Sequence, residues 1–191
     1  AVRRVLDGYA AARQANGARD ARHRIEHIEV LHPDDLPRLR DLGVVASMQP
    51  SHPPGAMDFP FEPWRSMVGE ARLAHGFPVA AIHAAGVPIA FASDWPITDI
   101  NPMRGIKAAL LRPPLGAGCP NNRIPLMQAL AHYTTGGAFA GFDEARLGRI
   151  APGLLADLVV MDHDLEALPP EALDTARAAR TLSDGQIVWE S

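Results

Sequence analysis

Two hydrophobic periods alternate along the first half of the chain, one typical of helices and one typical of strands. The helical segments carry apolar residues every three or four positions, and Gly17 and Gly43 follow two of them as stop signals. The strand segments are short, apolar or alternating, and bounded by turn formers. This order of elements predicts an α/β protein whose parallel strands are joined by helical crossovers. The strand patterns occupy residues 23–30, 44–48 and 88–92, and the helical patterns residues 2–16, 33–42, 64–75 and 78–85.

The second half of the chain continues with helices and then becomes rich in strand patterns. Helical patterns cover residues 102–111 and 125–140. Asp184-Gly185, close to the C-terminus, is the strongest hairpin signal in the chain. We therefore divide the chain into an α/β unit, residues 1–146, and a small β appendage, residues 147–191. The strand-like runs of the appendage lie at residues 147–150, 156–161, 180–182 and 186–189.

The third strand pattern ends in a carboxylate. Ser93-Asp94 follows its last apolar residue, and Trp95-Pro96 then stops any regular structure. Catalytic groups of βα barrels collect at this end of the strands, so Asp94 is a candidate metal ligand or general base. The alternative is that Ser-Asp only caps the next turn, where both residue types are common.

The two earlier strand patterns also end in polar side chains with ligand chemistry. His27 lies in the first, while Gln49 and His52 directly follow the second. Imidazole and carboxylate are ligands of Zn²⁺ and similar ions. Taken alone, His27 reads as a core histidine and His52 as a solvated loop residue. The position that His27 and Asp94 share at strand ends favours a common site.

Composition restricts the function classes. The 191 residues are 47% apolar and 21% charged, which is ordinary for a globular protein. The net charge of −4, with basic residues spread along the chain, does not indicate nucleic-acid binding. A single cysteine, Cys119, fits a reducing compartment such as the cytoplasm, and no apolar run is long enough to span a membrane.

Several motifs, in this order, resemble the amidohydrolase superfamily. The resemblance is narrower to the amidohydrolase 3 group, which contains the N-substituted formamide deformylases and their YtcJ-like relatives. It covers essentially the whole chain. The motifs are residues 22–27 (RHRIEH), 44–52 (VVASMQPSH), 91–96 (FASDWP), Asn101-Pro102 with Gly105-Ile106, and 147–160 (LGRIAPGLLADLVV).

This resemblance implies the C-terminal part of a (β/α)₈ barrel, followed by one half of a β-sandwich. His27 then corresponds to a metal-ligating histidine, and Asp94 to the aspartate that ligates metal and handles the proton of the attacking water. Gln49, His52 and Trp95 fall where substrate-facing residues are expected. The implied cofactor is a divalent metal, zinc before others, with one or two ions in the complete protein.

The implied function is hydrolysis of a C–N amide-type bond, such as that of an N-substituted formamide, by metal-activated water. The mostly apolar residues 53–64 indicate a lid that favours an apolar or aromatic N-substituent. A cyclic amide, a carbamate or a ring that is deaminated is also compatible, because fold and metal do not determine substrate. The alternative function is a catalytically inert fragment or a non-catalytic association module.

The family's remaining ligands have no counterpart in this chain. These are a His-x-His pair after the first strand, a carboxylated lysine or acidic residue, and a histidine after the fifth strand. The chain also begins at Ala1 with a helical pattern already under way, so we expect it to be a piece of a longer protein. Two ligands alone fall short of the three or four that zinc sites use.

Three barrel strands expose unpaired edges and an apolar face. We therefore predict that this chain is stable only together with its missing part or as a homo-oligomer. Size-exclusion chromatography and thermal melting of the 191-residue chain test this. A monomer with a cooperative melt would contradict the prediction.

Overall fold

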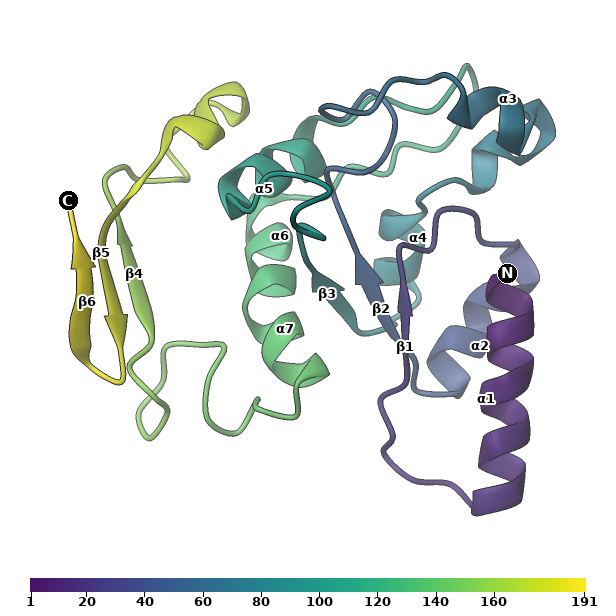
Figure 1. Ribbon diagram of the computed structural model, residues 1–191, viewed down its shortest axis with the longest axis horizontal. Helices are drawn as coiled ribbons and strands as arrows, with labels where there is room; N and C mark the ends of the chain where they lie inside the picture. The colour runs from purple at the N-terminus through teal and green to yellow at the C-terminus, as the bar shows by residue number, and fades with distance from the viewer.

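The computed structural model describes all 191 residues and contains two separate three-stranded sheets. The first sheet is parallel, with β2 between β1 and β3, as the sequence predicted (Figure 1). In its register Ile25 pairs with Ala46, and Ala46 with Ile89. All four residues of β2 are buried, as expected for the central strand of a covered sheet. The strands of this sheet are β1 (Arg24–Glu26), β2 (Val45–Met48) and β3 (Ile89–Phe91).

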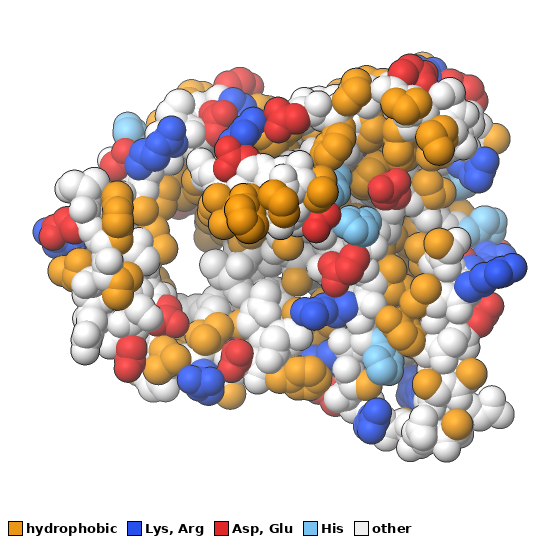
Figure 2. Space-filling view, in the orientation of Figure 1, with side chains coloured by type: hydrophobic (Ala, Val, Ile, Leu, Met, Phe, Trp, Pro, Cys, Tyr) orange, Lys and Arg blue, Asp and Glu red, His pale blue; other side chains and the backbone are white.

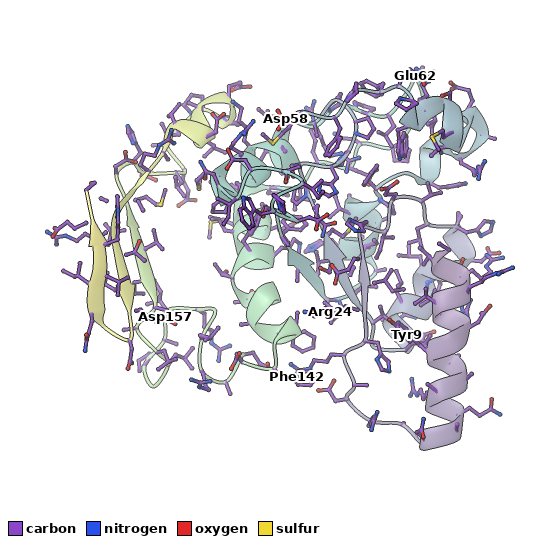
Figure 3. All side chains as sticks on the ribbon, viewed as in Figure 1. Tyr9, Arg24, Asp58, Glu62, Phe142 and Asp157 are labelled. Carbon is purple, nitrogen blue, oxygen red and sulfur yellow. The ribbon has the colours of Figure 1, made fainter.

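Helices cover the parallel sheet and share one core of 20 buried residues with it. Figure 1 shows α1 and α2 on the β1 side and α5, α6 and α7 on the β3 side. The Tyr9 hydroxyl donates to the carbonyl of Arg24 over 2.7 Å, which ties α1 to β1 (Figure 3). The helical elements of this part are α1 (Val2–Asn16), η1 (Pro33–Asp35), α2 (Leu36–Asp41), α3 (Trp64–Val68), η2 (Glu70–His75), α4 (Val79–Ala84), α5 (Pro102–Leu111), α6 (Leu126–Tyr133) and α7 (Thr135–Ala140).

The predicted helix 125–140 is in fact two helices. The backbone leaves the helical region at Thr134 (φ −109°, ψ −82°), which separates α6 from α7. Gly136 then lets α7 approach β3, because a Cβ at this position would lie 2.1 Å from the carbonyl oxygen of Ile89. The close packing of α7 on the sheet therefore depends on a residue without a side chain.

The predicted strand 23–30 ends early. His27 and Ile28 have positive φ angles of 66° and 46°, so the extended conformation stops after Glu26. Val30 instead forms an isolated antiparallel bridge with Gly76. The apolar pattern continues past the strand end because Ile25, Ile28 and Leu31 are all buried, so that every third residue of this turn still faces the core.

The second sheet is antiparallel, with the order β4-β5-β6, and belongs to the predicted appendage. The predicted hairpin is confirmed: Asp184 and Gly185 connect β5 and β6 with φ angles of 47° and 78°, as a type I′ turn requires. The predicted strand 147–150 is absent, because Gly148 has φ 96° and residues 147–149 bend instead of extending. The strands are β4 (Leu158–Met161), β5 (Ala178–Ser183) and β6 (Gln186–Glu190).

The appendage is attached through η3 (Pro170–Thr175) rather than through its sheet. Leu173 and Ala176 belong to the main core, each 1% exposed, and η3 packs on α5. Lys107 of α5 forms an ion pair with Asp174, 2.9 Å between Nζ and Oδ1. The sheet itself stands away from α6 and α7, and Figure 2 shows open space between them. Every residue of β6 is exposed.

No helix is both long and apolar enough to cross a membrane.

We expect His132 to make the stability of the fold depend on pH. Its ring packs against Phe91 and His83, with centroid distances of 5.0 and 5.3 Å, and its buried Nε2 has no hydrogen-bond partner. Burial, and secondarily the nearby His83, lowers the pKa of His132 from 6.5 to about 4. Between these values the unfolded chain binds a proton that the folded protein does not, so stability falls as the pH falls from 6.5 towards 4.

Replacement of His132 by phenylalanine should remove this loss. Between pH 7 and pH 5 we expect the wild-type protein to lose about 1–2 kcal/mol more free energy of unfolding than His132→Phe. Urea unfolding at the two pH values measures the difference, and His163→Gln, at a half-exposed histidine, is the control. Parallel losses in wild type and His132→Phe would contradict the assignment.

Candidate metal centre

Three side chains with ligand chemistry meet beyond the ends of the parallel strands: His27, His52 and Asp94. One potential ligand atom from each lies within 4.8 Å of the other two. His52 Nε2 is 3.9 Å from Asp94 Oδ2, and the rings of His27 and His52 are stacked with centroids 5.5 Å apart. The three residues thus form a cluster that faces a common point.

The hydrogen-bond ladder of the sheet places two members of this cluster. The amide of His27 donates to the carbonyl of Ser47 over 2.8 Å, one step beyond the end of β1. On the other side of β2, the amide of Ala92 donates to the carbonyl of Met48 over 3.1 Å, two residues before Asp94. Because β2 accepts both bonds, the positions of His27 and Asp94 are coupled through one strand.

Left-handed backbone geometry aims both side chains. His27 has φ 66° and Asp94 has φ 56°, a region that residues other than glycine rarely adopt. Such conformations disfavour folding by about 1 kcal/mol or more each, and they cluster at functional sites. The two residues that the sequence singled out at strand ends are therefore both held in uncommon conformations.

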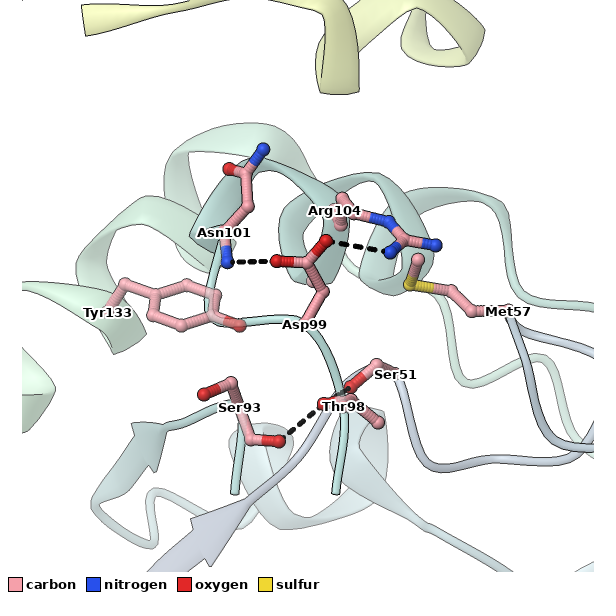
Figure 4. Close-up of a pocket in the computed structure, with 9 residues that line it drawn as sticks. Ser51, Met57, Ser93, Thr98, Asp99, Asn101, Arg104 and Tyr133 are labelled. Carbon is pink, nitrogen blue, oxygen red and sulfur yellow. Dashed lines mark hydrogen bonds and ion pairs between the residues drawn. The ribbon is translucent and has the colours of Figure 1, made fainter. Parts of the chain in front are cut away.

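His52 arrives from the loop after β2, which hydroxyl groups tie to the loop after β3. The amide of His52 donates to the carbonyl of Gln49 over 3.1 Å, which forms a tight turn. The neighbouring Ser51 Oγ lies 3.0 Å from Thr98 Oγ1, and the Thr98 hydroxyl donates to the carbonyl of Ser93 (Figure 4). The residues beside His52 and Asp94 are thereby joined directly.

The loop after β3 has its own anchor. Asp99 accepts hydrogen bonds from the amide of Asn101 and from the guanidinium of Arg104, each over 2.9 Å (Figure 4). These two donors hold the pKa of Asp99 below its usual value. Asn101 in turn caps α5 through its side chain, which accepts from the amide of Met103. The path of the loop from Asp94 to α5 is therefore fixed at both ends.

The electrostatics of the cluster suit a cation. Burial, and next the nearby His27, lowers the pKa of His52, so its ring is neutral at pH 7 with a lone pair free. His27 Nδ1 and His52 Nε2 are buried without a hydrogen-bond partner. Buried polar atoms are normally paired, so two such nitrogens beside a carboxylate indicate a missing ligand.

The distances also fit a metal ion. Nitrogen and oxygen ligands lie about 2.0–2.2 Å from Zn²⁺, so two atoms on one ion are at most about 4.4 Å apart. The 3.9 Å between His52 and Asp94 meets this limit directly. The widest spacing in the cluster, up to 4.8 Å, needs a closing movement of a few tenths of an ångström, which a side-chain rotation supplies.

The other predicted site residues lie outside the cluster. Gln49 is buried, and its Oε1 has no hydrogen-bond partner. Trp95 follows Asp94 in the chain but is 65% exposed. Their assignment to substrate binding stays a prediction. A substrate-facing role is predicted for His52 as well, and that prediction also stays open; the structure places its side chain beside His27 and Asp94, which makes it a candidate metal ligand too. The hydrophobic pattern of the sequence could not have shown this position of His52, because it depends on the path of the loop after β2.

The fold and the cluster define a class: an α/β protein with a candidate metal centre at the ends of parallel strands. The family model of the amidohydrolases, Amidohydro_3, matches residues 1–189. The chain belongs to this family, and relatives in it support the narrower amidohydrolase 3 group.

Three curated relatives match most of the chain. It is 36% identical to the protein LONG AFTER FAR-RED 3 of Arabidopsis thaliana over 82% of this chain and 27% of the relative. It is 30% identical to the putative amidohydrolase YtcJ of Bacillus subtilis (100% and 36%). It is also 30% identical to the N-substituted formamide deformylase of Arthrobacter pascens (97% and 34%). The chain therefore spans about a third of the length of these relatives.

A solved structure agrees with the fold. An uncharacterized metal-dependent hydrolase from Pyrococcus furiosus superposes with a TM-score of 0.63 at 27% identity, over 80% of this chain and 29% of that one.

If His52 is a ligand, its removal should weaken metal binding. We expect His52→Gln to bind Zn²⁺ at least about 10-fold more weakly than the wild-type protein, because one of three ligand atoms is lost. Equilibrium dialysis with metal analysis measures this, with His83→Gln as the control, since His83 lies outside the cluster. Equal affinity of His52→Gln and wild type would remove His52 from the ligand set.

Proposed function

We propose that the complete protein is a metal-dependent hydrolase that cleaves a C–N amide-type bond. The observation that carries this proposal is the cluster of His27, His52 and Asp94, with two buried imidazole nitrogens that lack a partner. The family and a relative named as an N-substituted formamide deformylase support the bond type. An N-substituted formamide or a similar small amide is the proposed substrate.

The fold proposed for the complete protein is a (β/α)₈ barrel with a β-sandwich. Residues 1–146 contribute the C-terminal part of the barrel, and residues 147–191 contribute part of the sandwich. Two features support this. Both outer edges of the parallel sheet, on β1 and β3, lack a strand partner, and the exposed antiparallel sheet carries apolar side chains, among them Val159, Ile187 and Val188.

His27, His52 and Asp94 would hold the metal, which we take to be zinc. When bound, a divalent ion lowers the pKa of water to about 7 and polarises a carbonyl oxygen. One imidazole nitrogen of each histidine is buried without a partner, while the Asp94 side chain is 40% exposed and reaches both the cluster and solvent. Asp94 can therefore contact the cluster and a substrate at the same time.

Asp94 is the proposed proton carrier. The oxygen of water attacks the carbonyl carbon, and the Asp94 carboxylate accepts the proton that water loses. The same proton then passes to the nitrogen as the C–N bond breaks, so that the products are a carboxylic acid and an amine, which ionise in solution to a carboxylate and an ammonium. A carboxylate is suited to both steps, since it is a base before the attack and an acid after it.

Replacement of Asp94 by asparagine should abolish turnover and leave the fold intact. The Asp94 side chain accepts no hydrogen bond within the structure, so Asp94→Asn disturbs little packing. We expect kcat for N-benzylformamide to fall at least about 100-fold, which is the usual contribution of a general base or acid. The turnover, the metal content and the melting curve are all measured on the full-length protein and on its Asp94→Asn variant.

Asp41→Asn is the matched control, because Asp41 is exposed and pairs only with the neighbouring Arg40. Retained turnover in Asp94→Asn would overturn the mechanism. Absence of both metal and amide hydrolysis in the wild-type protein would instead favour a non-catalytic member of the family.

A further inference from the structure

A cavity of about 270 Å³ lies beside the candidate metal centre, and its lining combines aromatic rings with two carboxylates. His52 belongs both to this lining and to the candidate metal-ligand cluster, so the cavity and the candidate site share this side chain. The side chain of His52 is only 9% exposed, and its Nε2 has no partner. The carboxylates are those of Glu29 and Glu62, and the rings are those of Phe59, Trp64 and Phe77.

One wall of the cavity is fixed by backbone pairing. The amide of Phe77 donates to the carbonyl of Glu29 over 2.8 Å, next to the bridge between Val30 and Gly76. A Cβ on Gly76 would lie 2.3 Å from the Leu115 side chain and 3.2 Å from the Trp64 ring, so a larger residue here would displace these neighbours. Glu29, Trp64 and Phe77 are therefore held as a unit.

The two carboxylates are positioned by neutral donors rather than by cations. Trp64 Nε1 donates to Glu29 Oε2 over 3.0 Å. The amide of Ser66 donates to Glu62 Oε2 over 3.1 Å, at the start of α3, where Figure 3 labels Glu62. Neither glutamate forms an ion pair within the chain, and each has a second carboxylate oxygen that accepts no hydrogen bond. Both residues line the cavity.

The aromatic rings complete a site for a positive charge. Trp64 and Phe77 are paired with ring centroids 5.5 Å apart, and Phe59 packs edge-on against His52 at 5.4 Å. Aromatic faces attract ammonium groups, and tryptophan does so most strongly. An apolar N-substituent would contact the rings but leave both carboxylates without a counter-ion.

We propose that this cavity binds a primary ammonium group carried by the N-substituent of the substrate. The inference names the substrate class of the proposed hydrolase and rests on that proposed function. The substrate is then an amide whose nitrogen bears an aromatic or aliphatic spacer that ends in an amine. The carboxylates of Glu29 and Glu62 neutralise the ammonium, while Phe59, Trp64 and Phe77 contact the spacer.

Binding without turnover tests the charge preference. Isothermal titration of the full-length protein at pH 7 compares benzylammonium, benzyl alcohol and phenylacetate, which share a ring but differ in charge. We expect benzylammonium to bind at least about 10-fold more tightly than benzyl alcohol, and phenylacetate to bind most weakly. The preference should shrink at 1 M salt, where the Debye length is about 3 Å.

Substitution of the two glutamates tests whether their carboxylates cause the charge preference. The double variant Glu29→Gln, Glu62→Gln should bring the affinity ratio of benzylammonium to benzyl alcohol close to one, with benzyl alcohol affinity unchanged. Glu171→Gln, at an exposed position of η3, is the control and should keep the ratio. Equal affinities in the wild-type protein, or a ratio that survives the double variant with an unchanged melting curve, would overturn the inference.

Turnover separates this inference from the proposed function. N-[4-(aminomethyl)benzyl]formamide should show a kcat/KM at least about 10-fold higher than N-benzylformamide, and the double variant should remove that difference. Hydrolysis of both at equal kcat/KM contradicts the ammonium site while the hydrolase proposal stands. Hydrolysis of neither contradicts the hydrolase proposal, and the titrations still decide whether the cavity selects a cation.

Discussion

The hydrogen-bond ladder of β2 is the constraint on which the candidate site depends. The carbonyls of this strand accept hydrogen bonds from the amides of His27 and Ala92 on its two sides. The segments after β1 and β3, which carry His27 and Asp94, therefore cannot move independently. The burial of all four β2 residues locks the strand in the core. The Ser51–Thr98 contact then joins the following loops and adds His52 to the same frame. Ligand positions thus follow from strand pairing.

Polar atoms without partners are concentrated where this frame ends. Five buried side-chain polar atoms lack a hydrogen bond, and three of them belong to His27, Gln49 and His52. Leaving a buried donor or acceptor unpaired disfavours folding by about 1–3 kcal/mol. The left-handed backbone at His27 and Asp94 adds to this. Both costs fit the proposal that the site is organised for a ligand, and a cation bound by the two histidines would offset the cost of their unpaired nitrogens.

The sequence predicted the frame better than the details of the site. The bounds of α1, the parallel order of three strands and the Asp184-Gly185 hairpin agree with the structure, because periodicity and turn chemistry are local properties. The early end of β1, the break at Thr134 and the turn at Gly148 depend on backbone angles that no hydrophobic pattern encodes. His52 joins the cluster for a similar reason, since its position follows from contacts between two loops.

The residues that line the cavity beside the site pack on a core that is separate from the core of the parallel sheet. Leu73, Phe77 and Leu115 form a small core of their own, separate from the 20-residue core around the sheet. Phe61 and Trp64 pack against this small core, and Trp64 orients Glu29. Substitutions among these lining residues should therefore alter the cavity, while the hydrogen bonds of β2 that position His27 and Asp94 stay unchanged. Under the proposed function, such a division would let one ligand set serve different N-substituents, and the proposed selectivity for a cation would depend on Glu29 and Glu62.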